Sequence, residues 1–204
     1  MSDVTLERVP KGRLGVWFLI AGELVIFGGF IAAYILARLE YPEFGSKEAA
    51  GALNPIVGTI NTMILLISNW TMVVAHEAAL EKNVAKMKSF MLYTLVLGLV
   101  FLGIKLGYEW PADFHEGHTI SSAKAIAGAE PGGEVMKVSL FWSYYFLMTG
   151  FHGLHIVVGS LVILGVYISC SGGENLHRVE LAGAYWHLVE LVWVILFPMF
   201  YLIK

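Results

Sequence analysis

Seven ionisable residues lie within long apolar stretches of this chain: Glu23, His76, Lys105, His152, His155, His187 and Glu190. A charged group at the centre of a membrane helix costs about 2.5–3.5 kcal/mol on insertion scales. Each side chain must therefore face another helix, a cavity or a partner. Carboxyl and imidazole groups in such places can exchange protons, bind metals or join helices through hydrogen bonds.

Two pairs of these residues share one spacing. His152 and His155 are three residues apart, as are His187 and Glu190, so each pair lies on one helix face. Imidazole and carboxylate suit iron or zinc, but the known di-iron bundles use two Glu-x-x-His helices and two further Glu residues. We therefore predict no metal site and no catalytic site, and interpret His152, His155 and Glu190 as an interhelical polar cluster.

Glu23 lies midway along the first apolar stretch, with no cation within one helical turn. An unpaired carboxyl in hydrocarbon favours its neutral form. Two interpretations stay open: a carboxyl that exchanges protons or contacts lipid, or a protonated acid hydrogen-bonded to a neighbouring helix. Further along, Lys105 and Glu109 are four residues apart, which indicates an ion pair.

The composition excludes most soluble classes of protein. Of 204 residues, 57% are apolar or aromatic and 14% are charged, against roughly 45–50% and about 25% in soluble domains. The net charge of −3 gives no basic surface for nucleic acid. The single Cys170 excludes an internal disulfide. A polytopic membrane protein remains, with its backbone polar groups paired inside helices.

Five stretches have the length of about 20 residues or more that a span requires: 14–37, 59–80, 90–108, 140–170 and 181–203. The fourth is long enough to tilt or to project beyond the bilayer. They predict one all-α integral membrane domain over residues 1–204, a bundle of five transmembrane helices with an outward loop over 109–139. Aromatic residues near span ends predict a belt at the interfaces: Trp17, Tyr34, Tyr108, Trp110, Trp142 and Tyr201. Glycines predict close helix packing at Gly28–Gly29, Gly98, Gly103, Gly150 and Gly153.

Charge on the connections predicts the orientation. Five spans put the termini on opposite faces, and the N-terminal face carries seven Lys and Arg residues (Arg8, Lys11, Arg13, Lys82, Lys86, Lys88, Arg178) against five on the other (Arg38, Lys47, Lys124, Lys137, Lys204). The positive-inside rule then places the N-terminus in the cytoplasm and the C-terminus outside.

With these residues in view, the chain resembles subunit III of haem-copper respiratory oxidases (cytochrome c oxidase subunit III). The first matching block is TGFHGLH at 149–155, followed by Gly159. The second is YWHLVELVW at 185–193, where Glu190 stands in place of the usual Asp. The third is Glu23 with Phe27, Gly29 and Phe30, which matches the carbodiimide-reactive membrane carboxyl of the family.

The resemblance implies the short five-helix bacterial form, which lacks the N-terminal helix pair of the seven-helix form and resides in the bacterial inner (plasma) membrane. It implies a non-catalytic subunit without haem or copper, which are expected in partner subunits. Such a subunit packs directly on oxidase subunit I, in a complex with subunit II. It supports proton uptake and turnover stability while the complex reduces O₂ to water.

Two other functions stay open at this point. The same fold occurs in quinol oxidases and beside nitric oxide reductase, and a membrane enzyme or transporter with its own His/Glu metal site is a more distant alternative. Without the N-terminal pair, the resemblance also implies a groove. We expect phospholipid to fill it, with headgroups near His76, Arg178, Trp186 and His187.

Overall fold

The computed structural model describes residues 11–41, 53–115, 133–170 and 172–202, and these parts are helical with no strands. Five long helices make up most of them: α1 (Lys11–Glu40), α3 (Pro55–Leu80), α4 (Val84–Ile104), α7 (Glu134–Ser169) and α8 (His177–Phe197). Each is long and apolar enough to cross a membrane. The chain is thus a multi-pass all-α membrane protein, which confirms the predicted fold class.

The third span continues further than its hydropathy indicates. A π-helical turn, η1 (Lys105–Glu109), and a short helix, α5 (Trp110–His115), extend α4 into the segment expected as a loop over 109–139. The extension is held by aromatic packing, because Trp110 and Phe114 both contact Phe146 of α7. At the other end of that loop, α7 begins at Glu134, and residues 116–132 lie outside the described parts.

Asparagine caps set the starts of α3 and α4. The Asn54 side chain accepts hydrogen bonds from the backbone N–H groups of Ile56 and Val57, at 3.0 and 3.4 Å, and Pro55 follows at the first helical position, where it is favoured. Asn83 caps α4 through the N–H of Lys86 at 3.1 Å. The short turn between Leu80 and Val84 therefore joins α3 and α4 as a helical hairpin.

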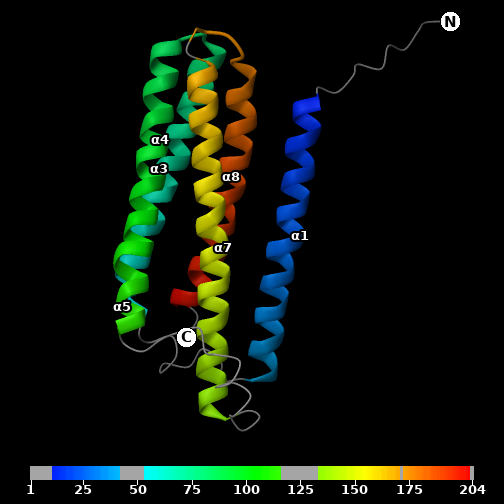
Figure 1. Cartoon of the computed structure of the whole chain (residues 1–204), viewed down its shortest axis with the longest axis vertical. Coiled ribbons are helices and arrows are strands. Elements are labelled where there is room, and N and C mark those ends of the chain that lie inside the picture. Colours follow the sequence, from blue (N-terminus) through cyan, green and yellow to red (C-terminus); the bar gives the residue numbers. More distant parts are fainter. Residues whose placement is uncertain (1–10, 42–52, 116–132, 171, 203–204) are drawn as a thin grey trace, which may run out of the picture.

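The helices α3, α4, α7 and α8 form the bundle, and α1 runs along one side of it (Figure 1). Of the most apolar stretch of each helix, 61% is buried in α8 but only 11% in α1. A second π-helical turn, η2 (Pro198–Leu202), ends α8 within the core. The start of α1 lies at the same end of the bundle as the α3–α4 turn and the α7–α8 connection (Figure 1).

Trp186 of α8 is the residue around which three other helices pack. Its indole N–H donates to Ser68 Oγ of α3 at 3.2 Å. A Cβ atom at Gly98 of α4 would lie 2.7 Å from the indole, and one at Gly159 of α7 would lie 3.0 Å from it. At Gly98 a side chain would overlap the ring, and at Gly159 the ring would have to shift by a few tenths of an ångström, so glycine allows the close approach of both helices.

Two expectations about packing hold only in part. A Cβ atom would lie 2.7 Å from Trp186 at Gly98, 3.3 Å from Trp110 at Gly150 and 3.7 Å from Leu102 at Gly153, as close packing predicts. At Gly28, Gly29 and Gly103 it would meet nothing within 4 Å, so these three glycines do not mediate close contacts between the described helices. Of the predicted belt, Trp17 and Tyr108 are exposed, at 65% and 60%, but Tyr34, Trp142 and Tyr201 are buried in the core. Position near a span end does not reveal which side of the helix an aromatic ring occupies.

Candidate functional site

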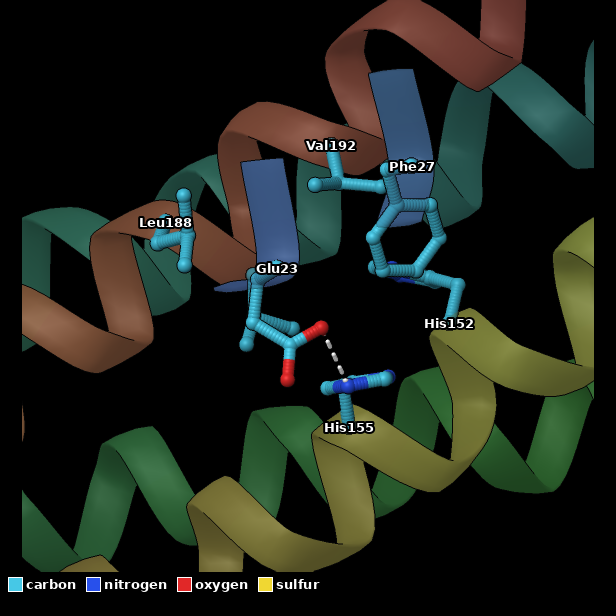
Figure 2. Close-up of a pocket in the computed structure, with 7 residues that line it drawn as sticks. Glu23, Phe27, His152, His155, Leu188 and Val192 are labelled. Atoms are coloured by element: carbon cyan, nitrogen blue, oxygen red, sulfur yellow. Dashed lines mark ion pairs between the residues drawn. The ribbon is translucent and has the colours of Figure 1, made fainter. Parts of the chain in front are cut away.

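Glu23 of α1 meets His155 of α7 at the contact between the outlying helix and the bundle (Figure 2). Glu23 Oε2 lies 2.7 Å from His155 Nε2, and the two side chains are 14% and 13% exposed. The oxygen accepts no hydrogen bond of standard geometry, so this is a close contact at ion-pair distance rather than an aligned bond. The carboxyl that has no cation within one turn of its own helix therefore has an imidazole partner on another helix.

The second nitrogen of the same ring fixes the tautomer. His155 Nδ1 lies 2.6 Å from the Phe151 carbonyl oxygen, which can only accept, so Nδ1 carries a proton and donates it. Nε2 is then the nitrogen that gains or loses a proton beside Glu23. One proton added to the neutral imidazole and the carboxylate leaves the pair neutral overall, whichever group holds it.

Aromatic rings and a small cavity surround this pair. Phe27 stands edge-on to the His155 ring, with centroids 5.3 Å apart, and Phe30 packs on Phe151 at 5.4 Å. The cavity is about 10 Å³, room for about one water molecule, and is lined by Glu23, Phe27, His152, His155, Leu188, Val189 and Val192. The pair thus lies in mostly apolar surroundings.

The expected cluster of His152, His155 and Glu190 does not form. His152 is buried, its ring stacks on Trp193 at 5.2 Å, and neither ring nitrogen has a hydrogen-bond partner. Glu190 faces Asn69 of α3 instead. The physical reason is helical geometry: three residues turn a helix by about 300°, so His152 and His155 diverge by about 60° and meet different neighbours.

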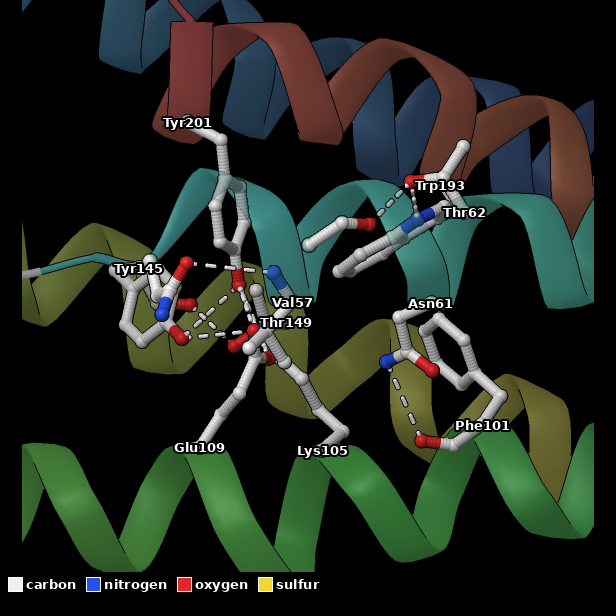
Figure 3. A network of polar contacts seen from close by, with 12 residues as sticks. Val57, Asn61, Thr62, Phe101, Lys105, Glu109, Tyr145, Thr149, Trp193 and Tyr201 are labelled. Atoms are coloured by element: carbon white, nitrogen blue, oxygen red, sulfur yellow. Dashed lines mark hydrogen bonds and ion pairs between the residues drawn. The ribbon is translucent and has the colours of Figure 1, made fainter.

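Lys105, directly after the end of α4, lies at the centre of a buried polar network (Figure 3). Its Nζ donates to Glu109 Oε2 at 2.6 Å, to the Tyr145 hydroxyl at 2.9 Å and to the Tyr201 hydroxyl at 2.5 Å. The Tyr201 hydroxyl in turn lies 3.0 and 3.1 Å from the two Glu109 oxygens. The Lys105 and Glu109 side chains are only 2% and 7% exposed.

This network is larger than the ion pair that the i,i+4 spacing predicts. It joins η1, α7 and η2, so three distant segments share one cation. The sequence did not identify Tyr145 and Tyr201 as partners of Lys105, although the buried ammonium group indicates that further acceptors must be present. A buried Lys has three donors to satisfy, and Glu109 alone accepts only one of them.

The four residues expected near lipid headgroups lie in different surroundings. Trp186 is 1% exposed in the core and is therefore not available to a headgroup. His76 of α3 and His187 of α8 are half-buried neighbours that influence each other electrostatically. Arg178 is exposed in the first turn of α8.

A larger cavity of about 290 Å³ lies between α1 and α8. Five of its lining residues are apolar or aromatic (Val16, Trp17, Ile20, Leu181 and Ala184), and the other two are Arg13 and Glu180. Arg13 and Glu180 form an ion pair across the cavity, with Arg13 Nη2 2.7 Å from Glu180 Oε1. Both charged side chains are about half exposed. The cavity therefore combines an apolar wall with charges at its edge.

Within the described ranges, no group of three or more His, Cys, Asp or Glu side chains is arranged to hold a metal ion. The alternative of a membrane enzyme or transporter with its own His/Glu metal site thus finds no set of ligands in these ranges.

A family model and individual relatives all identify the same family for this chain. The family model for cytochrome c oxidase subunit III matches residues 5–128 and 134–204. Cytochrome c oxidase subunit 3 from Thermostichus vulcanus is 31% identical over 93% of this chain and 86% of its own length. The protein of the same name from Bacillus sp. (strain PS3) is 31% identical over 98% and 89%. The one from Loxodonta africana is 32% identical over 93% of this chain but 68% of its own length. The length of this chain matches the shorter bacterial relatives.

Proposed function

This chain belongs to the cytochrome c oxidase subunit III family, a non-catalytic part of that oxidase whose members carry no redox metals, and on this premise we propose its role within the complex. It packs directly on catalytic subunit I, in a complex with subunit II, and these partners hold the haem and copper. It supports proton uptake and turnover stability during reduction of O₂ to water, and it holds phospholipid.

The pair Glu23–His155 is the observation that carries the proton-uptake role. A carboxyl and an imidazole 2.7 Å apart can share one proton with no net charge on the pair, and intramembrane acids mark proton-handling functions. Glu23 lies on α1, the least buried of the five long helices, and His155 lies on α7. The pair is therefore close to the surface that lipid or another subunit covers.

The role is one of support and not of pumping. His152 lines the same small cavity, but its nitrogens make no hydrogen bond to Glu23 or His155. In the described parts of the chain, the pair is thus not continued by a chain of hydrogen bonds. We infer that it buffers or delivers protons locally, beside a path that lies in subunit I.

Turnover of the complex with Glu23→Gln tests this role. We expect the initial oxidase rate and the proton-to-electron ratio to stay near those of the unchanged complex, while activity is lost after fewer turnovers. Glu81→Gln is the matched control, because that acid is exposed, is paired with Lys86 and lies outside the lining of the α1–α8 cavity. A Glu23→Gln complex that assembles but loses pumping entirely would place Glu23 on the pumping path and overturn the supporting role.

The cavity between α1 and α8 supports the lipid proposal. Its apolar wall suits an acyl chain, and Arg13 of α1 at its edge suits a phosphate. Arg178 is a second, exposed cation in the first turn of α8, two residues before Glu180 of the cavity wall. His76 and His187 lie on the α3–α8 side of the bundle and contribute to a second, weaker polar site for a headgroup.

The cationic end of the bundle supports the proposed orientation. Arg13 begins the first span, and Lys82, Lys86, Lys88 and Arg178 flank the α3–α4 turn and the α7–α8 connection at the same end. This end faces the cytoplasm of a bacterial cell under the positive-inside rule. The protein therefore spans the inner membrane with its C-terminus outside.

A further inference from the structure

Glu190 of α8 is a buried acid without the partner that its sequence suggests. It is 3% exposed, and neither of its carboxyl oxygens has a hydrogen-bond donor. An ionised carboxyl in this place would be an uncompensated buried charge, which costs several kcal/mol. The identity of the groups around it therefore decides which form it takes.

The groups on α8 and α3 supply no cation. His187 lies one turn before Glu190, but its Nδ1 has no partner and its charge neighbour is His76 of α3. The polar group that faces Glu190 from α3 is the Asn69 amide. His187 thus donates no hydrogen bond to Glu190.

The other helices that pack on α8 carry ionisable groups that are engaged elsewhere. On α7, His155 contacts Glu23 of α1, and the charge neighbours of His152 are His155 and Lys105. Throughout the described ranges, no Lys, Arg or His side chain forms an ion pair with Glu190.

The Asn69 side chain lacks a hydrogen-bond donor for its carbonyl oxygen. Its Oδ1 is buried and accepts no hydrogen bond, and a carboxylate cannot supply one because it has only acceptors. A protonated carboxyl has one O–H donor as well as a carbonyl acceptor. Protonating Glu190 therefore gives Asn69 Oδ1 its missing donor, and the Asn69 NH₂ group is a donor for the remaining Glu190 oxygen.

We propose that Glu190 is a neutral carboxylic acid paired with the Asn69 amide, and that the α3–α8 contact is a proton-holding site separate from Glu23. One proton, taken up from water, resides on a Glu190 oxygen. The pair then joins the two helices without a net charge in the bilayer. Glu23 shares its proton with an imidazole, whereas Glu190 keeps its own.

Infrared difference spectroscopy of the membrane-embedded complex at neutral pH tests the proposal. Glu190→Gln should remove one carboxylic-acid C=O band, and that band should shift to lower frequency in D₂O. Glu180→Gln, which changes an exposed acid paired with Arg13, should remove carboxylate bands only. Loss of carboxylate bands alone in Glu190→Gln would show an ionised Glu190 and overturn the proposal.

Asn69→Leu supplies a second test that keeps the acid in place. Removing the amide should move the Glu190 C=O band to higher frequency, because its hydrogen bonds are lost. A carboxylic-acid region identical to that of the unchanged complex would contradict the pairing. This variant answers the question even where Glu190→Gln fails to accumulate, and neither spectrum depends on the role proposed for Glu23.

Discussion

The Nζ atom of Lys105 lies 2.5 Å from the hydroxyl of Tyr201, a residue 96 positions further along the chain. Each residue stands in a π-helical turn, η1 and η2. Such turns redirect side chains by inserting one residue into a helix. The two irregular turns thus converge on one buried cation, which ties the end of α8 to the end of α4.

Removing that cation should destabilise the fold strongly. Lys105→Met leaves Glu109 buried without its partner, and breaking a buried pair from one side costs about 3–5 kcal/mol. The double variant Lys105→Met/Glu109→Gln should recover much of this loss, because no charge then remains unpaired. Unfolding titrations in mixed micelles measure both. A double variant as unstable as the single one would show that the charges are not the cause.

Gly98→Ala should also destabilise, by about 1–3 kcal/mol, because the new methyl group would overlap the Trp186 ring. Gly103 of the same helix is the matched control, since nothing lies within 4 Å of its Cβ position. There alanine should be neutral or stabilising by up to about 1 kcal/mol through helix propensity. Equal effects at the two positions in thermal unfolding would rule out the contact as the reason.

Glu23 should be the preferred target of hydrophobic carbodiimides, which partition into lipid and react with protonated acids. Its side chain is 14% exposed on the outlying helix, whereas Glu190, although neutral in our proposal, is enclosed at 3%. Mass spectrometry of labelled peptides should find the adduct on the α1 peptide and none there in Glu23→Gln. Labelling mainly at Glu190 would contradict this difference in access.

Lipid retention should depend on the cationic end of α8. Arg178→Ala should lower the amount of phospholipid that stays bound in native mass spectrometry, because an exposed cation is lost from the first turn of α8, two residues before Glu180 of the cavity wall. Lys86→Ala is the control, because it removes an exposed cation from the first turn of α4. If both variants retain the same lipid as the unchanged complex, Arg178 does not belong to the site.

Hydropathy and spacing predicted the elements but not their partners. The five spans follow from apolar length, and the shared helix face of His152 and His155 follows from their spacing. Which helix each side chain meets depends on how the helices are rotated in the bundle, and the sequence of one helix does not contain that rotation. The sequence of α1 left open whether Glu23 meets lipid or a neighbouring helix, and its neighbour is His155 of α7. Glu190 was expected beside His152 and His155 and instead faces Asn69 of α3.

The buried network around Lys105 shows the same limit. Lys105 and Glu109 lie on one helix, so their contact could be predicted locally. Tyr145 and Tyr201 come from α7 and η2, and Tyr201 was assigned to the membrane interface because it lies near a span end. Only the packing of three segments reveals that its hydroxyl completes the hydrogen bonding of the ammonium group.

Purification of the complex through an affinity tag on this chain tests the central claim most directly. The account predicts that subunits I and II co-purify in mild detergent with the haem and copper of a terminal oxidase. When the tagged chain is then separated from them, it should show no Soret band and no stoichiometric iron or copper. A chain that purifies without an oxidase, or that keeps its own haem or metal after separation, would contradict the assignment.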